Sequence, residues 1–356
     1  MKLGARVLKT GIAIVLALTL AQVLNLPTPV FAAIAAVFAL QPTIFRSYNH
    51  IVEQVQGNLI GAITAVLFVW FLGNDYIFVG LAAIIVIALN LTLKLEKTIS
   101  LSLVTMIVIM ESTQDSFVTF ALLRFSTIML GVLSAFIVNL FFLPPKHEKR
   151  LYNLIEELVQ ETTRWLRLTI RHASQHKLLK NDIRKMQTTI RELDTLYGMF
   201  KEERSYLSFF KKETLTKSRK LVIYRQMIST ARRSLETLRR IHRYENEFLQ
   251  MPEEFQILIQ QQLDILVHHH EHVMLKHLKK VKTHVVFEEG EVQLDRKALV
   301  QIFFQYIKEA NIEDEAILTH NMQIISSIVD YEEQLEHLNR LINSFQRFHV
   351  KANKEK

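Results

Sequence analysis

The sequence predicts an all-α membrane protein, with a six-span transmembrane domain over residues 1–145 and a cytosolic antiparallel helical bundle over residues 146–356. Three observations lead to this class. Only seven Lys or Arg and five Asp or Glu residues precede residue 144, while 36 basic and 30 acidic residues follow it. Six apolar stretches fill the first part. After Pro144 and Pro145, apolar residues recur with the period of an amphipathic helix.

The six apolar stretches have the composition of membrane spans. A bilayer core needs about 20 helical residues, so the second, third and fifth stretches are short. Each of these three must recruit flanking polar residues or sit as a shortened helix. The stretches run Val7–Leu26, Val30–Phe45, Leu59–Leu72, Ile77–Leu93, Ile99–Met110 and Phe117–Leu143.

The basic residues of the connections predict the orientation. Positive charge is retained on the cytoplasmic side of a membrane. Among the segments that flank the stretches, only the start of the chain up to Lys9 and the connections after the second, fourth and sixth stretches contain Lys or Arg. Six spans with both termini inside satisfy every connection. Cleavage of a signal peptide after "VFAAIAA" would reverse the later spans and leave Arg46, Lys94 and Lys97 outside, which the same rule disfavours.

A weak internal repeat relates the first three spans to the last three. An offset of 70 residues places Gln54 on Arg124 and, with no gap, superposes further small residues: Gly57 on Thr127, Gly61 on Gly131, and Ala65 on Ala135. Three spans per unit force the second unit to be inverted, a construction that recurs in secondary transporters. Gly57 with Gly61, and Gly131 with Ala135, are small-residue pairs that predict close helix packing.

Polar residues within the spans are candidates for a transport pathway, because such groups are costly in lipid. They are Gln41, Pro42, Arg46, Gln54, Asn90, Glu111, Arg124 and Asn139. Glu111 is the candidate titrating group, and Arg46 and Arg124 are candidates for attracting a carboxylate. Interhelical hydrogen bonds explain the asparagines equally well. Arg124 lies about 30 Å from Leu143 along a helix, so an anchor at the outer interface is an alternative role for it.

Two segments resemble a known family. They are "LQPTIFRSYNHIVEQVQGNLIGAITA" (40–65) and "RFSTIMLGVLSAFIVNLFFLPP" (124–145). With their Gln-Pro, spaced glycines and terminal Pro-Pro, they are similar to the bacterial aromatic acid exporter family, which is related to the fusaric-acid-resistance-like proteins. The cytosolic half is similar in length and helical character to the domain of the Gram-positive branch. The resemblance implies efflux of aromatic carboxylates through the inner membrane. Many relatives carry two six-span halves, so it also implies a homodimer or higher homo-oligomer.

The cytosolic half predicts one domain of about five to six helices. Its apolar faces include Leu151 to Leu166 and Leu318 to Phe345, Pro252 marks a helix start or break, and the segment around Gly290 reads as a loop or short hairpin. Residues 201–243 carry a basic surplus. That surplus fits either an anionic lipid leaflet or a solvated face, and no binding motif accompanies it, so no nucleic acid is expected.

The segment "HHHEHVMLKH" (268–277) is the one histidine-rich stretch. It lacks the zinc-protease spacing, so no metal is expected, and His268, His269, Glu271 and His272 are the weak candidates if one binds. Walker, nucleophile-elbow and phosphate-loop motifs do not occur. We therefore expect neither an enzyme nor a cofactor.

The leading hypothesis is a secondary exporter of small organic anions that uses a proton or ion gradient. The rival hypothesis is a membrane-anchored scaffold or sensor that acts through its cytosolic helices and transports nothing. A polar-lined cavity that includes Gln41, Asn90, Glu111 or Asn139 would favour the exporter.

Overall fold

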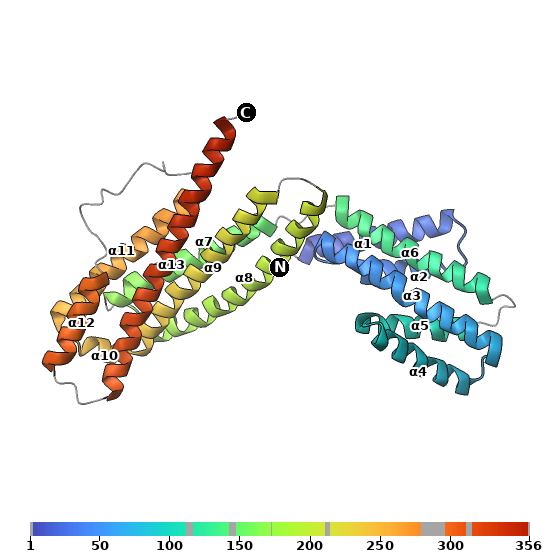
Figure 1. Ribbon diagram of the computed structural model, residues 1–356, viewed down its shortest axis with the longest axis horizontal. Coiled ribbons are helices and arrows are strands. Elements are labelled where there is room, and N and C mark those ends of the chain that lie inside the picture. The colour runs from blue at the N-terminus through green and yellow to red at the C-terminus, as the bar shows by residue number, and fades with distance from the viewer. Residues whose placement is uncertain are drawn as a thin grey trace. The chain divides into compact units, whose positions relative to one another are not determined.

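The computed structural model describes residues 3–111, 117–141, 147–171, 173–210, 214–278, 296–310 and 315–354. These residues form thirteen α-helices and one short 3₁₀ helix, and they contain no strand. The chain divides into two compact units, Met1–Pro145 and Lys146–Lys356 (Figure 1). The predicted all-α class is confirmed.

Among its described residues, the first unit contains six apolar α-helices in chain order. Two of them, α3 and the Val118–Phe141 part of α6, are long and apolar enough to cross a membrane, judged by length and composition. Helices α2 and α5, with 11 and 12 residues, are shorter than a bilayer core requires. The six are α1 (Leu3–Val23), α2 (Pro29–Ala39), α3 (Ile44–Leu72), α4 (Tyr76–Thr92), α5 (Ile99–Met110) and α6 (Phe117–Phe141).

The boundary between α2 and α3 differs from the prediction. Helix α2 ends at Ala39, and α3 already begins at Ile44, so Phe45 belongs to α3 and residues 44–58 extend it. The reason is Pro42, which has no N–H and disfavours a helical residue before it. Thr43 then caps α3, because its hydroxyl accepts a hydrogen bond from the Arg46 N–H at 3.2 Å. The third apolar stretch thus gains its length from polar residues.

The six helices pack as two groups, one of α1, α2 and α6 and the other of α3, α4 and α5, which contact each other through α3 and α6. Helix α3 packs mainly against α5 with α4 beside it, and α6 packs against α2 and α1 (Figure 1). A Cβ atom on Gly61 of α3 would collide with the Ser102 carbonyl of α5. A Cβ on Gly131 of α6 would likewise collide with the Ala32 carbonyl of α2.

These two contacts are related by the 70-residue offset. Gly61 corresponds to Gly131 and Ala32 to Ser102, so the third helix of each repeat touches the second helix of the other repeat. Two contacts that exchange partners in this way are what a pseudo-two-fold repeat requires. The apolar cores follow the same division, with one cluster on α1, α2 and α6 and a second cluster mainly on α3, α4 and α5.

The second unit contains seven helices among its described residues, one or two more than predicted. The additional element is the five-residue helix α10 (Glu245–Leu249), which is too short to leave a periodic pattern. The helix after it begins directly behind Pro252, where a helix start or break was predicted. The other six are α7 (His147–Ile170), α8 (His176–Phe210), α9 (Thr214–Arg243), α11 (Glu253–His277), α12 (Arg296–Ala310) and α13 (Glu315–Lys354). The predicted loop around Gly290 lies outside the described residues.

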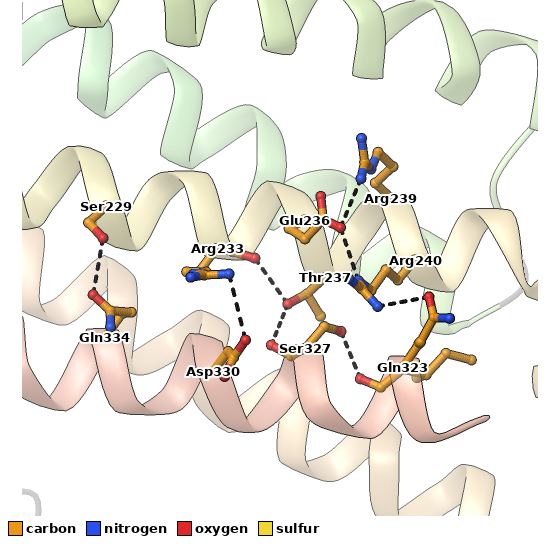
Figure 2. Close-up of polar contacts among 11 residues, drawn as sticks. Ser229, Arg233, Glu236, Thr237, Arg239, Arg240, Gln323, Ser327, Asp330 and Gln334 are labelled. Carbon is orange, nitrogen blue, oxygen red and sulfur yellow. Dashed lines mark hydrogen bonds and ion pairs between the residues drawn. The ribbon is translucent and has the colours of Figure 1, made fainter. Parts of the chain in front are cut away.

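Helices α9 and α13 run antiparallel along a polar seam (Figure 2). Ser229 donates to the Gln334 side chain at 3.1 Å, and further along α9 the Thr237 hydroxyl donates to the Ser327 carbonyl at 2.9 Å. The residue numbers of the partners on α13 decrease as the residue numbers on α9 increase, which shows that the two helices run in opposite directions. The seam closes with Arg240, which donates to Gln323 at 2.9 Å.

The apolar core of this unit lies between α7, α8, α9, α11 and α13. The predicted face of α7 is buried as expected, and so is most of the predicted face of α13, where Ile325, Leu335, Leu338 and Ile342 are buried and Met322 is the exception. Met322 is 48% exposed, whereas Ile324, Ile328 and Tyr331 are fully buried. A 40-residue helix spans about 60 Å, so its buried stripe drifts around the axis and one register cannot hold throughout.

Several basic residues of α9 pair with acids of the same unit. Arg232 pairs with Asp194 at 2.9 Å, and Arg233 lies 3.6 Å from Asp330. The remaining pairs are Lys220 with Glu148, and Arg239 and Arg240 with Glu236. These basic side chains therefore serve contacts between and along helices, while Lys211, Lys212 and Lys217 lie outside the described side chains.

Candidate functional site

Arg124 is buried in the first unit. It lies on α6 with 5% of its surface exposed, and its guanidinium carbon is 4.3 Å from the centre of the Phe31 ring on α2. The Nε and Nη1 atoms have no hydrogen-bond partner. A side chain that anchors a helix at a water interface would be exposed, so the geometry does not match that alternative.

The internal repeat explains why Arg124 lacks partners. Its counterpart Gln54 on α3 is also buried, 6% exposed, but its amide contacts His50 at 3.2 Å and Asn58 at 3.2 Å, one turn away on either side. The residues one turn away from Arg124 are Phe120 and Ile128, which offer no acceptor. The second copy of this position thus places a cation where the first copy places a satisfied amide.

A buried guanidinium with two unpartnered nitrogens has the chemistry of an anion-binding site. Leaving buried donors of a charged group unsatisfied costs more than about 1–3 kcal/mol, and a carboxylate satisfies two parallel N–H groups of arginine at once. The neighbouring Phe31 ring offers an apolar surface on which the remainder of an organic anion can pack.

Lys9 is a second buried cation of the first unit. It lies on α1 with 8% of its surface exposed, and its Nζ donates to Asn139 Oδ1 on α6 at 3.1 Å. A buried charge must be hydrogen-bonded, yet the hydrogen-bond partner of Lys9 Nζ is the neutral amide of Asn139, so the charge itself is not balanced. In the sequence Lys9 serves only as an orientation signal, although it is the third residue of the first apolar stretch, and this position was the signal that it lies within the helix.

Asn139 joins four segments. Its Nδ2 donates to Ser47 Oγ on α3 at 2.8 Å and to the Gln41 carbonyl at 3.0 Å. That carbonyl is available because the chain leaves the helical path before Pro42. Gln41, Pro42 and Asn139, predicted separately, therefore meet in one cluster with Lys9 and Ser47.

The two cations lie near opposite ends of the group α1, α2 and α6. Lys9 is close to the start of α1 and meets α6 near its end, whereas Arg124 is close to the start of α6. Residues 124 and 139 are about 22 Å apart along the helix at 1.5 Å per residue. The buried cationic groups are thus distributed along most of the length of α6.

Two other predicted residues, Gln54 through its neighbour Asn58, and Asn90, make local contacts. Asn58 receives a hydrogen bond from Thr105 of α5 at 2.6 Å, which links the Gln54 region to that helix. Asn90 donates to the Val86 carbonyl at 2.8 Å and accepts from Thr98 at 2.7 Å. Its polar atoms are used in the turn between α4 and α5, so the geometry gives Asn90 a structural contact.

The remaining predicted residues are not brought together with these clusters. Arg46 and Glu111 are exposed, at the start of α3 and the end of α5. Gly57 faces Leu101 of α5, at a distance where an added Cβ would overlap that side chain. Ala135 is fully buried in the α1, α2 and α6 core.

The histidine-rich segment on α11 does not form a single ligand set. His270 is fully buried and its Nδ1 lies 2.8 Å from the Tyr331 hydroxyl, while Glu271 accepts from Arg167 at 2.8 Å. Burial lowers the pKa of His269 and His270 to about 4 and about 3, respectively. The side chains of this segment therefore point to different neighbours.

Comparison with known proteins gives matches over the whole chain. The family described as aromatic acid exporter family member 1 matches residues 1–142, and the aluminium activated malate transporter family matches residues 97–299. The UPF0421 protein YgaE of Bacillus subtilis is 50% identical over 99% of this chain and 98% of its own length. A UPF0421 protein of Bacillus cereus ATCC 14579 is 28% identical over 66% of this chain and 70% of its own.

Proposed function

Because the chain belongs to the aromatic acid exporter family, we propose that it is a secondary exporter of small organic anions, with aromatic carboxylic acids as the substrate class. Both matching families are named for membrane transporters of carboxylic acids, and the chain is accordingly a membrane protein. Its work would be transport and not catalysis. The proposed place is the bacterial plasma membrane, with six crossings, both termini inside and the second unit in the cytoplasm.

Arg124 is the observation that carries this proposal. A carboxylate that accepts from Nη1 and the adjacent Nη2 of Arg124 would satisfy one of its two unpartnered buried nitrogens, and an aromatic ring on the same substrate would pack against Phe31. The two features of the proposed substrate, an acid group and a ring, thus match two neighbouring side chains.

Lys9 extends the proposed pathway toward the other end of α6. In the proposed orientation the Lys9–Asn139 cluster lies near the cytoplasmic face and Arg124 near the outer face. An anion leaving the cell would meet the cluster of Lys9 first and Arg124 second. The fixed positive charge at each end lowers the cost of moving an anion through a low-dielectric region.

The membrane potential by itself favours the export of an anion. Moving one negative charge out of a cell whose interior is negative gains about 2.3 kcal/mol per 100 mV, enough for roughly fiftyfold accumulation outside. We therefore propose that the membrane potential drives export. Glu111, at the C-terminal end of α5, is kept as the proposed titrating group for any additional proton coupling.

We further propose that the working unit is a homodimer, because the family resemblance pairs two six-span halves and this chain supplies one. The cytosolic unit would then contribute to pairing or to control of the pathway. Light scattering of the detergent-purified full chain, corrected for bound detergent, gives the number of copies per particle. A monomer at all concentrations would contradict the dimer.

The test is flux through reconstituted protein. The purified full-length chain is reconstituted into liposomes, which are loaded with a radiolabelled benzoate-type acid. A potassium gradient with valinomycin sets the membrane potential. The proposal expects efflux that needs the protein, increases with a potential that drives anions outward and is inhibited by other aromatic acids. A pH gradient at zero potential, applied to the wild type and to Glu111→Gln, separates proton coupling from charge movement.

The same experiment distinguishes the exporter from the alternative function. A membrane-anchored scaffold or sensor would produce no protein-dependent efflux of any organic anion in these liposomes. An efflux equal to that of empty liposomes, with protein shown to be folded and oriented, would overturn the transport proposal.

A further inference from the structure

Three potential metal ligands meet at one corner of the second unit. His176 is the first residue of α8, His242 lies in the last turn of α9, and Glu245 is the first residue of α10. The turns after α7 and α9 bring them together, although 66 residues separate the two histidines. This separation is why the sequence, which draws attention to the contiguous histidines at 268–272, gives no signal for the group.

The distances suit a single ion. His176 Nδ1 lies 3.3 Å from Glu245 Oε2, and the His176 and His242 ring centres are 4.1 Å apart. One ligand atom from each of the three residues lies within 4.8 Å of the others. Ligands at about 2.0–2.2 Å from one metal are at most about 4.4 Å apart, so a small side-chain rotation completes the set.

An independent observation points to a missing ligand at the same place. His242 is only 7% exposed, and its Nδ1 is buried with no hydrogen-bond partner. A buried polar atom without a partner is costly, and a metal ion bonded to it would remove that cost. The opposite side of the group is open, because the side chain of His176 is 65% exposed and that of Glu245 is 29% exposed. An ion therefore has access from solvent.

We propose that His176, His242 and Glu245 bind one divalent transition-metal ion of the zinc, cobalt or nickel type. Two imidazoles and one carboxylate are a common ligand set for these ions, and water completes the fourth position. The bound ion ties the beginning of α8 to the junction of α9 and α10. This site is separate from the proposed transport pathway and does not depend on it.

The segment at residues 268–272 provides the matched comparison. There Glu271 is engaged by Arg167 and His270 by Tyr331, so these ligands are already used. His268 is exposed on α11 and offers a histidine of the same type outside the proposed group. Its substitution controls for the loss of any surface histidine.

The test uses the full chain, purified in detergent after removal of any polyhistidine tag, and titrated with zinc chloride in a calorimeter. Wild type should bind one ion per chain, and His176→Ala should weaken binding at least tenfold. Glu245→Gln should weaken it in the same direction, whereas His268→Ala should leave affinity unchanged. Because the side chain of His176 is largely exposed, helix content and metal-free melting temperature should not change in His176→Ala.

A cobalt titration adds a readout of geometry. Tetrahedral Co²⁺ with nitrogen and oxygen ligands absorbs in the visible range, and this band should be absent in His176→Ala; Mg²⁺, which prefers oxygen ligands, should not compete. The proposal is overturned if His176→Ala binds zinc as tightly as wild type, if no stoichiometric binding occurs, or if His268→Ala is the variant that loses the ion.

Discussion

The guanidinium carbon of Arg124 lies 4.3 Å from the centre of the Phe31 ring, and both residues come from helices of opposite repeats. The contact covers one face of the guanidinium but satisfies none of its N–H groups, since a ring face accepts a cation without replacing in-plane hydrogen bonds. The pair therefore combines an anchored cation with unused donors, which is the basis of the first two predictions.

Replacing Arg124 by Gln should reduce flux of aromatic carboxylates about ten- to a hundredfold. Hydrogen bonds to charged groups contribute about 1.5–3 kcal/mol, and the substitution removes the charge and the parallel donors. Efflux from liposomes measures the loss. Lys97→Gln is the matched control, because Lys97 is an exposed cation of the same unit, with 85% of its side chain accessible. Equal flux in wild type and Arg124→Gln would remove Arg124 from the pathway.

Replacing Phe31 by Leu should change selectivity more than rate. An aromatic pair contributes about 0.5–1.5 kcal/mol beyond its buried area, so the ratio of benzoate-type to aliphatic carboxylate flux should fall about two- to tenfold. Competition between the two labelled acids in one liposome preparation measures this ratio directly. An unchanged ratio would show that the ring does not contact the substrate.

Asn139→Leu should destabilise the first unit by several kcal/mol, because it leaves Lys9 Nζ and Ser47 Oγ without their partner. The double variant with Lys9→Met should cost less than the sum of the two single variants, since no buried charge then remains. Thermal loss of monodispersity in detergent ranks the four proteins. Strict additivity would mean that the two residues do not interact.

Gly61→Ala and Gly131→Ala should each lower stability by about 1–3 kcal/mol, the range for overpacking a filled core. Their new Cβ atoms would meet the backbone carbonyls of Ser102 and Ala32, which cannot rotate away. Gly80→Ala is the control, because no atom lies within 4 Å of its added Cβ. Because the two positions are equivalent in the repeat, we expect comparable losses of stability at 61 and 131. The melting temperatures of all variants in the same detergent measure these losses.

Acid should destabilise the second unit through His270. Burial holds the pKa of this imidazole at about 3 in the folded chain, against about 6.5 when unfolded. Protons therefore bind the unfolded state more readily below pH 6.5. The stabilisation is complete above that pH and falls by about 1.4 kcal/mol per pH unit as pH decreases toward the folded pKa.

The measurement is urea unfolding of the full chain at pH 7 and pH 5, followed by the fluorescence of Trp165 in a Trp70→Phe background. These are the two tryptophans of the chain. His270→Gln should be less stable at pH 7, because it disturbs the contact with Tyr331, but its loss of stability between the two pH values should be about 2 kcal/mol smaller. An identical pH dependence in both proteins would assign the acid sensitivity to other groups.

Much of the fold follows from composition and spacing, whereas the contacts of the site do not. The charge-poor and charge-rich parts of the sequence indicate the two units. Locally, Pro42 and Thr43 mark the break between α2 and α3, and Gly61 marks a close helix contact. The exposure of Met322 on α13 and the short helix α10 were not predicted from the sequence, because packing against other helices decides both.

The predicted pathway residues illustrate the same limit. Gln41 and Asn139 are 98 positions apart in the sequence, and only the return of α6 to the end of α2 brings the amide to the carbonyl. Lys9 was used as a charge that indicates membrane orientation. Its burial depends on the packing of α6 against α1, which brings Asn139 to Lys9. Glu111 and Arg46 carry suitable chemistry, but the ends of their helices leave them exposed.

The sequence by itself determined the helical class, the membrane family and the 70-residue repeat, because these depend on composition, period and motif. Tertiary structure alone decided which polar groups are satisfied. It brought no acceptor from another helix to Arg124 Nε and Nη1, brought Asn139 to the Gln41 carbonyl, and placed His176 beside His242. Such differences arise because hydrogen bonding depends on what folding places within about 3 Å, and residues far apart in sequence supply most of those neighbours.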